Sequence, residues 1–370
     1  MEAIQKQIQE FKISSDEQLE LTIQLSGKER SEVHEFVKSN GLYSKTDTRG
    51  ANKFVKIAKT AFLSNGEVEI NERLIESFSH WSGIPIPVTV PSELQYCLDL
   101  LSPYHPTKET FQIFMSAVKK EGSGEQFSQK LGEIMETIGS DLQRKLERTE
   151  KFVLEGKPKI LIKSSVYQHG NENKKFISID IRKANFTLLQ HFYPDLFDGL
   201  TWPNYVGKFT DCDFIKQSKI FREVVFGKIG VCRKVLEAAP FFLNKVIDLL
   251  KINPDHIISL AGDEMVLSIG DELNATDAHF TYEQIETFRK TLDQEYPNWF
   301  AVKVFWLVKI GERPWFVKEH TDGQIEFKCC PKKLMFQCIK KYTGKPIVSN
   351  DLKFMDEFGV ATFDAPLFSV

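Results

Sequence analysis

The stretch from His256 to Ile269 constrains the fold most strongly. It consists of two apolar, β-rich runs separated only by Gly262, Asp263 and Glu264. Apolar runs on both sides of a short polar break that contains glycine are typical of a β-hairpin with buried strands. The two acids are therefore expected in a tight turn, where the strands on either side hold them in place.

A second acid is expected at the end of a strand. Residues 176–180 read Phe-Ile-Ser-Ile-Asp, and the pattern after Asp180 becomes helical, with apolar side chains at positions 186, 188, 189 and 192. Carboxylates held by strands suit Mg²⁺, which prefers oxygen ligands in fixed geometry. Two such acids brought together would suit a two-metal phosphoryl-transfer site. An Asp that only caps the following helix is the alternative interpretation.

A cationic helix is expected between these two segments. Lys219, Arg222, Glu223 and Phe226 follow one another at helical spacing, so they share one face. Two cations beside an aromatic ring suit a nucleotide, because the cations meet its phosphates and the ring packs on its base. Gly227 would let a template backbone approach closely. The alternative is an amphipathic helix with a buried Phe.

These three segments resemble the motifs of right-hand nucleic acid polymerases. The strand that ends in Asp180 resembles motif A, and the turn at Asp263 resembles the Gly-Asp-Asp turn of motif C. That turn is also similar to the Gly-Asp-Glu turn of diguanylate cyclases. The segment from Lys219 to Gly227 resembles motif B of family B DNA polymerases, with Phe226 where Tyr is usual and Arg222 with the following Glu where Asn-Ser is usual.

The resemblance implies a role for each matching residue. Asp180 and Asp263 would bind two Mg²⁺ or Mn²⁺ ions, with Glu264 as the neighbouring acid. Asn185 lies where such polymerases test the sugar, and its amide leaves the choice between dNTP and rNTP open. The remaining positions would bind the incoming nucleotide and the template: Lys219, Arg222, Phe226 and Gly227.

The first sixty residues predict a small β-α-β domain. Residues 19–25 and 53–58 alternate apolar and polar side chains, as half-buried strands do. Ser26 and Glu29 form a capping box at the start of the helix between them, and Asn40-Gly41 closes it. Arg30 and His34 are one helical turn apart, so they could grip a phosphate together or be a solvated surface pair.

This region, LSGKERSEVHEFVKSNGLYSKTDTRGANKFVKIAK, resembles the Arg-xxx-His domain family that binds single-stranded nucleic acid. The resemblance covers about residues 15–60. It implies that Arg30 and His34 contact the nucleic acid backbone and that Arg49 and Lys53 contact further phosphates. The loop Thr46-Asp47-Thr48-Arg49 departs from the family, where more Gly and Glu are usual.

The connecting and C-terminal regions are predicted from periodicity. Helices are expected over residues 93–101, 107–120, 126–152 and 282–296, and the apolar stripe of the third is expected in the core. Strands are expected over 160–167, 300–310, 315–320 and 324–329, the last two as a hairpin. Lysines interleaved with aromatics, among them Lys318 and Lys328, suit a primer-grip hairpin and a thumb that hold a duplex. Solvated strand edges are the alternative.

The composition of the chain limits the functions and the cell compartments that can be expected. The net charge of −3 shows no overall basic excess, so nucleic-acid binding must rest on local patches. The six cysteines have no zinc-like spacing, which favours reduced thiols in an intracellular protein, cytoplasmic or nuclear. We find neither a signal-peptide pattern nor a long apolar run, so no membrane partner is expected.

The sequence therefore predicts an α+β protein in four parts. These are a single-strand-binding domain (1–62), a helical linker or fingers-like region (63–155), a palm-like, ferredoxin-like antiparallel sheet with helices (156–299) and a thumb-like region (300–370). The expected function is metal-dependent addition of nucleoside triphosphates to a primer-template, with partner proteins left open. Alternatives are a degenerate palm that only binds RNA or single-stranded DNA, and a cyclase-like nucleotide synthase. A metal-dependent nuclease would need more clustered carboxylates.

Overall fold

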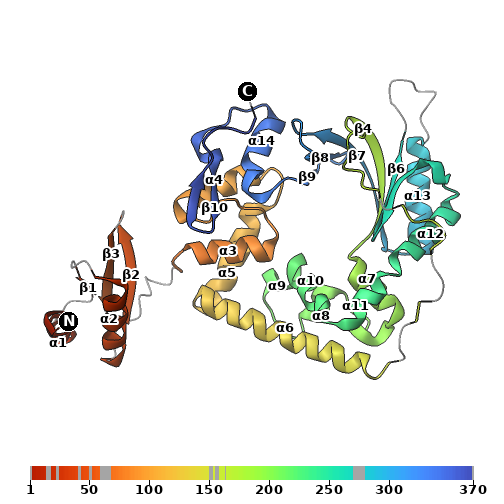
Figure 1. Ribbon diagram of the computed structural model, residues 1–370. Helices are drawn as coiled ribbons and strands as arrows, with labels where there is room; N and C mark the ends of the chain where they lie inside the picture. The colour runs from red at the N-terminus through yellow and green to blue at the C-terminus, as the bar shows by residue number, and fades with distance from the viewer. Residues whose placement is uncertain are drawn as a thin grey trace. The chain divides into compact units, whose positions relative to one another are not determined.

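A computed structural model describes residues 2–13, 18–21, 25–40, 43–49, 52–58, 68–149, 153–154, 158–162, 164–269 and 280–368. The chain forms two compact units, Met1–Glu69 and Ile70–Val370 (Figure 1). It belongs to the mixed α+β class, as predicted. No helix in the described ranges is long and apolar enough to cross a membrane.

The first unit is a three-stranded antiparallel sheet with two helices. Its elements are α1 (Glu2–Ile13), β1 (Gln18–Leu21), α2 (Gly27–Ser39), β2 (Tyr43–Arg49) and β3 (Asn52–Ala58), with the strand order β1-β3-β2. The predicted β-α-β frame is present, but α1 and β2 were not predicted. Apolar side chains of both helices and of the sheet form one core, which includes Ile8, Val33 and Val55.

The predicted capping box of α2 is confirmed. The Ser26 backbone N–H donates to Glu29 Oε2 at 2.8 Å, and the Glu29 backbone N–H donates to Ser26 Oγ at 3.3 Å. These two bonds satisfy donors that the first turn of a helix otherwise leaves free. α2 ends at Ser39 as expected, while Gly41 lies outside the described residues.

The second unit begins with helices. They are α3 (Glu72–Ser82), α4 (Pro91–Leu101), α5 (Thr107–Glu121) and α6 (Gly124–Leu146). The predicted stripe of α6 is buried from Leu131 to Leu142, although the helix ends at Leu146 and not at residue 152. Several of the thirty Phe residues pack here edge to face, with Phe114 5.4 Å from Phe127 between ring centroids. Such aromatic pairs bury large apolar surfaces and fix the angle between helices.

A series of short helices follows the first strand of the large sheet. They are α7 (Ala184–Phe192), η1 (Pro194–Phe197), α8 (Trp202–Val206), α9 (Asp213–Gln217), α10 (Lys219–Gly227), α11 (Gly230–Leu236), α12 (Ala239–Leu250) and η2 (Pro254–His256).

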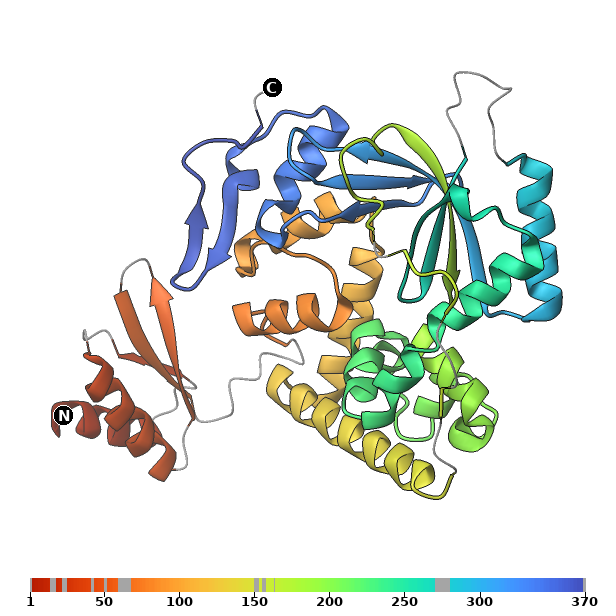
Figure 2. The same cartoon turned by 45° about the vertical axis from the view of Figure 1, so that its right-hand side comes forward.

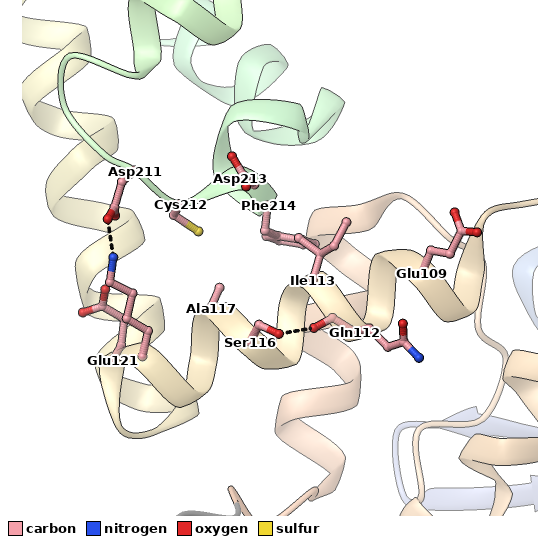
Figure 3. Close-up of a pocket in the computed structure, with 11 residues that line it drawn as sticks. Glu109, Gln112, Ile113, Ser116, Ala117, Glu121, Asp211, Cys212, Asp213 and Phe214 are labelled. Atoms are coloured by element: carbon pink, nitrogen blue, oxygen red, sulfur yellow. Dashed lines mark hydrogen bonds and ion pairs between the residues drawn. The ribbon is translucent and has the colours of Figure 1, made fainter.

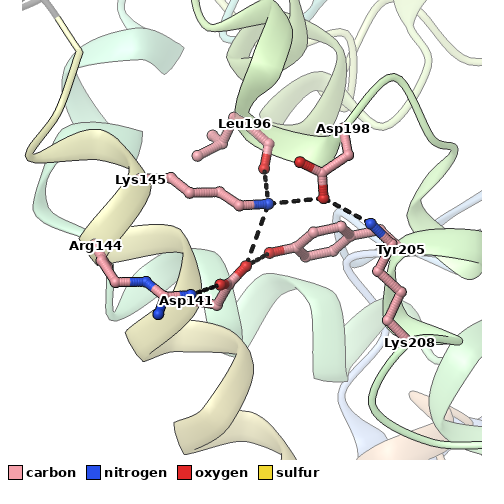
Figure 4. A network of polar contacts seen from close by, with 7 residues as sticks. All are labelled: Asp141, Arg144, Lys145, Leu196, Asp198, Tyr205 and Lys208. Carbon is pink, nitrogen blue, oxygen red and sulfur yellow. Dashed lines mark hydrogen bonds and ion pairs between the residues drawn. The ribbon is translucent and has the colours of Figure 1, made fainter.

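A polar network ties α6 to these short helices (Figure 4). Tyr205 Oη donates to Asp141 Oδ2 at 2.6 Å. Lys145 Nζ lies 3.3 Å from the same carboxylate and 2.8 Å from Asp198 Oδ2, which also accepts from Lys208 Nζ at 2.6 Å. Because each acid contacts more than one donor, the network fixes the end of α6 against η1 and α8.

The large sheet has six strands in the order β5-β6-β4-β7-β8-β9, and all neighbours are antiparallel. The strands and the helix between them are β4 (Lys174–Ile181), β5 (Ile257–Ala261), β6 (Glu264–Ser268), α13 (Tyr282–Glu295), β7 (Phe300–Lys309), β8 (Phe316–His320) and β9 (Ile325–Lys328). The predicted hairpins β5-β6 and β8-β9 are confirmed. Because β7 pairs with β4, the predicted boundary at residue 299 falls within one sheet.

The two faces of the sheet differ. Ile177 and Ile179 of β4 are fully buried on one face, which α12 and α13 cover (Figure 2). Side chains that alternate with them, such as Ser178 and Asp180, point to the other face. An apolar cluster that includes Phe176, Phe305 and Val166 covers one end of that second face. The remaining end holds the polar side chains described below.

The predicted strand 160–167 is wrong. Among residues 160–162 and 164–167, which the structure describes, one isolated bridge forms, between Ile162 and Leu260 of β5. The side-chain amide of Asn244 on α12 accepts from the Ile160 N–H and donates to its carbonyl, both at 2.8 Å. These bonds satisfy the backbone N–H and carbonyl groups of Ile160, which would otherwise need a partner on a neighbouring strand.

The C-terminal elements pack back on the first helices of the same unit. They are η3 (Lys332–Leu334), α14 (Met335–Thr343), η4 (Ser349–Leu352), β10 (Lys353–Asp356) and β11 (Gly359–Thr362). Lys353 Nζ donates to Glu93 Oε1 of α4 at 2.6 Å, and the Met355 N–H donates to the Pro87 carbonyl at 2.9 Å. The predicted thumb-like region is therefore joined to the predicted linker.

Candidate functional site

The open end of the polar face forms a pocket of about 360 Å³. It gathers residues from α7, α10 and five of the six strands. Its lining residues are Tyr167, Ser178, Asp180, Ile181, Lys183, Ala184, Asn185, Lys219, Arg222, Glu223, Asp263, Glu264, Ala301, Lys303, Lys318, His320, Glu326 and Lys328. Eight of the fourteen predicted site residues therefore meet here.

Asp180 and Asp263 are neighbours because β4 and β6 pair. Asp180 pairs with Glu264, and the Ile181 N–H donates to the carbonyl oxygen of Asp263 at 2.9 Å. Gly262 has φ of +63°, a left-handed conformation that glycine adopts without steric cost and that turns β5 into β6. The two predicted acids thus lie side by side at the ends of rigid strands.

The two carboxyl groups resist ionisation. Burial, followed by the charges of Asp263 and Glu264, raises the pKa of Asp180 to about 7. Burial also raises the pKa of Asp263, and Glu264 adds to this effect. A cation bound between them would favour the charged forms of both groups.

Glu264 is held differently from the two aspartates. Its Oε1 accepts from Ser178 Oγ at 2.6 Å and from Lys318 Nζ at 2.8 Å. Burial acts to raise the pKa of Glu264, but the charge and hydrogen bond of Lys318 and the bond from Ser178 lower it. The sequence assigned Glu264 as the neighbouring acid of the two aspartates, and its bonds to Ser178 and Lys318 favour a positioning role.

The prediction that Lys318 contacts a duplex at the surface does not fit its position. The residue is only 4% exposed, and its Nζ lies 4.5 Å from the ring centroid of Phe305 and 5.6 Å from that of Tyr167. Its ammonium group forms an ion pair with Glu264 of β6, on another strand of the sheet. Lys328, at the rim, forms an ion pair with Glu326 at 2.6 Å and is partly exposed.

Helix α10 brings two cations to the pocket. Ser218 caps it by accepting from the Phe221 N–H at 3.0 Å, and its own hydroxyl donates to the Trp81 carbonyl at 2.6 Å. Lys219 is mostly exposed and lies 3.5 Å from Glu223, whereas burial lowers the pKa of Arg222. The helix start is therefore anchored while both cations reach the pocket.

The predicted roles of Phe226 and Gly227 do not fit. Phe226 is 1% exposed, and its ring centroid is 4.8 Å from that of Trp202, in the core. A base cannot stack on a ring enclosed in this way. Neither Phe226 nor Gly227 lines the pocket, whereas Asn185 does.

Sequence reasoning missed other lining residues. His320 Nε2 lies 3.0 Å from Glu326 Oε1, and this bond lowers the pKa of Glu326. Burial acts to raise that pKa, but the hydrogen bond and charge of Lys328 lower it further, so it lies well below its usual value. Lys183 follows β4 and has a pKa lowered by burial and by Arg222. The period-two pattern could have found His320 and Glu326, because they share the face of Lys318 and Lys328.

In the first unit, Arg30 and His34 are engaged with the protein itself. An Arg30 Nη1 group donates to the Leu25 carbonyl. The two ring nitrogens of His34 bond the hydroxyls of Ser44 at 2.7 Å and Thr46 at 2.9 Å. Burial, followed by the charge of Arg30, lowers the pKa of His34. His34 therefore fixes β2 against α2, and both of its nitrogens are occupied.

Arg49 and Lys53 belong to the β2-β3 hairpin, where Arg49 pairs with Asn52 and Lys53 with Thr48. Their side chains lie outside the described residues.

Another cavity, of about 460 Å³, lies between α5 and the segment before α9 (Figure 3). Lys120 and Asp211 form an ion pair at its edge. Its lining contains more acids than cations, and no predicted residue lies there. We therefore place the candidate site at the sheet and not in this cavity.

The sheet pocket combines the acids of β4 and of the β5-β6 turn with cations from α10 and from β7–β9, a combination that suits a phosphorylated ligand together with a divalent cation. No three His, Cys, Asp or Glu side chains converge as metal ligands among the residues that the structure describes.

Comparison with known proteins finds no matching protein family, no similar curated protein and no similar solved structure.

Proposed function

We propose that the unit Ile70–Val370 transfers nucleotides to a hydroxyl group in the manner of a nucleic acid polymerase. The observation that carries this proposal is the pocket in which Asp180 and Asp263 lie side by side with Lys219 and Arg222. These residues come from three segments that the sequence related independently to polymerase motifs. Their presence in one pocket is what a shared role requires.

The topology supports the same proposal. From β4 to β7 the chain runs strand, helices, strand, strand, helix, strand, with the order β5-β6-β4-β7. This order is consistent with the split β-α-β arrangement of ferredoxin-like sheets, and it supports the palm-like prediction. Strands β8 and β9 extend the sheet beyond it. A shared fold does not establish an activity, so the residues of the pocket carry the proposal.

Asp180 and Asp263 would hold Mg²⁺ or Mn²⁺. Their raised pKa values fit this role, because a bound cation removes the repulsion between them, and Mg²⁺ commonly takes one or two carboxylates together with substrate phosphates. The metal would stabilise charge on the reacting phosphoryl group and lower the pKa of the attacking hydroxyl.

The other residues would bind and position. Lys219 and Arg222 would neutralise the phosphates of the incoming nucleotide, and Asn185 would contact its sugar. Lys318 would keep Glu264 ionised and turned toward Ser178, which leaves the two aspartates for the cation. Lys303 of β7 and Lys328 of β9, which also line the pocket, would face the nucleic acid strand.

We propose in addition that the unit Met1–Glu69 binds single-stranded nucleic acid. Arg30 keeps further N–H donors besides the one given to Leu25, so it would contact a phosphate. His34 would position β2, which changes its expected role from contact to support.

Primer extension tests the main proposal. Labelled primer-templates would be incubated with dNTPs or rNTPs and Mg²⁺ or Mn²⁺, using wild type, Asp180→Asn and Asp263→Asn. Asp255→Asn is the matched control, because Asp255 is exposed and lies outside the pocket. Extension by wild type and the control, but by neither pocket variant, is the expected result.

The alternatives give other outcomes. No extension on any template, with single strands still bound through Arg30, would leave a nucleic-acid-binding protein. Small products formed from nucleoside triphosphates without a template would indicate a nucleotide synthase. Either result would overturn the polymerase proposal.

A further inference from the structure

A second charged cavity lies beside the first half of β7. Its volume is about 350 Å³, and its charged lining residues are Arg182, Arg289, Lys290 and Asp293. None of these residues lines the candidate site. The lining thus has three cations and one acid.

The two cavities lie on opposite faces of the sheet. Phe300 and Val302 of β7 line the second cavity, while Ala301 and Lys303 line the candidate site. Successive side chains of a strand point to opposite faces. The second cavity is therefore on the face that α13 covers, and a ligand there would not touch Asp180.

The backbone of β7 orients both arginines. Arg182 Nε donates to the Phe300 carbonyl at 2.8 Å, and Arg289 Nε donates to the Val302 carbonyl at 3.1 Å. Pairing of β7 with β8 begins further along, where the Val304 carbonyl accepts from the Thr321 N–H at 3.0 Å. The two arginines thus occupy the part of β7 that β8 leaves unpaired.

If the two arginines only covered this edge of β7, one donor for each carbonyl would be enough. Each guanidinium has further N–H groups, of which one Nη1 group of Arg289 donates to Glu286. Asp293 accepts from the Asn298 N–H at 3.2 Å, so its carboxylate is partly engaged. The remaining donors belong to two guanidinium groups whose orientation is fixed before any ligand arrives.

We infer that this cavity binds a phosphate group. Oriented guanidinium groups bind phosphate through paired hydrogen bonds, and Lys290 adds a third positive charge. The phosphate could belong to a free anion or to a nucleic acid strand, and both sources share this chemistry. The inference is independent of the proposed polymerase activity.

Titration calorimetry on the full chain tests it, with pyrophosphate and with a short 5′-phosphorylated single strand as ligands. All proteins would carry Lys219→Gln and Arg222→Gln, which removes two cations from the candidate site. Adding Arg182→Gln and Arg289→Gln should weaken binding of at least one ligand about tenfold or more. Adding Arg233→Gln, an exposed arginine on α11, should leave binding unchanged. The ligand whose affinity falls in the Arg182→Gln/Arg289→Gln protein identifies the source of the phosphate group.

Hydrogen exchange locates the ligand. Binding should slow amide exchange at the end of α13 and the start of β7, and the Arg182→Gln/Arg289→Gln pair should abolish that effect. Affinities for both ligands that stay within about twofold of the parent protein would overturn the inference. Unchanged exchange in this region at saturation would also overturn it. Asp180→Asn/Asp263→Asn should retain the binding even if primer extension fails, so the two proposals can fail separately.

Discussion

Replacing Lys318 with methionine would remove the cation from the ion pair that crosses the sheet. Met keeps most of the apolar volume against Phe305, while Glu264 loses its 2.8 Å partner beside two other acids. Breaking a buried pair on one side costs about 3–5 kcal/mol. Because the Glu264 side chain is 31% exposed, we expect the lower end, about 3 kcal/mol.

A double-mutant cycle isolates the pair. Glu264→Gln alone leaves an unpaired ammonium in the sheet, so it should also destabilise the protein. Lys318→Met/Glu264→Gln together should cost at least about 2 kcal/mol less than the sum of the single variants. The exposed pair Lys159–Asp248 is the matched control, and Lys159→Met should change stability by less than about 0.5 kcal/mol.

Urea unfolding followed by tryptophan fluorescence suits this cycle. All five tryptophans lie after residue 69, so the signal reports only on the second unit. Single and double variants that add within about 0.5 kcal/mol would refute the coupling of Lys318 and Glu264.

Three further predictions follow from the pKa shifts and the packing. The pKa of Asp180 is raised to about 7 in the folded protein, so folding takes up a proton at pH values between about 4 and 7. The contribution of Asp180 to the free energy of unfolding therefore falls as pH rises through this range. Asp180→Asn should therefore flatten the pH dependence of the unfolding free energy in this window, and an unchanged profile would contradict the shift. The His34 ring should titrate below its usual pKa by NMR, and Arg30→Gln should raise that pKa, because Arg30 contributes to lowering it. No response to Arg30→Gln would exclude this electrostatic contribution. Phe226→Ala should lower stability by about 3–5 kcal/mol in the fluorescence assay, with Phe209→Ala as the less buried control; a loss below about 1 kcal/mol would contradict the packing of Phe226 in the core.

Local patterns in the sequence predicted much of the sheet and part of the site. Apolar, β-rich runs on both sides of Asp263 and before Asp180 identified the strands, and the polar breaks that follow these runs located the acids. Their proximity depends on β4 pairing with β6, which no local pattern specifies. The burial of Lys318 likewise depends on the register between β7 and β8, which places it opposite Leu307.

The errors also have physical causes. Phe226 shares a helical face with Lys219 but lies about 10 Å further along the axis, where Trp202 encloses it. Residues 160–167 have the composition of a strand, but Asn244 takes up the backbone groups of Ile160. In both cases a contact from a distant segment overrides a valid local pattern.

The position of β4 at the centre of the sheet has a consequence for folding. Its two neighbours, β6 and β7, both follow it in the chain after the helices α7–α12 and after α13. During synthesis, β4 therefore emerges from the ribosome long before either partner exists, and contacts of such large sequence separation form slowly. A chain that ends before Phe300 would leave one side of β4 unpaired and able to associate with other strands. We expect truncation at this point to produce aggregates and not a smaller folded domain.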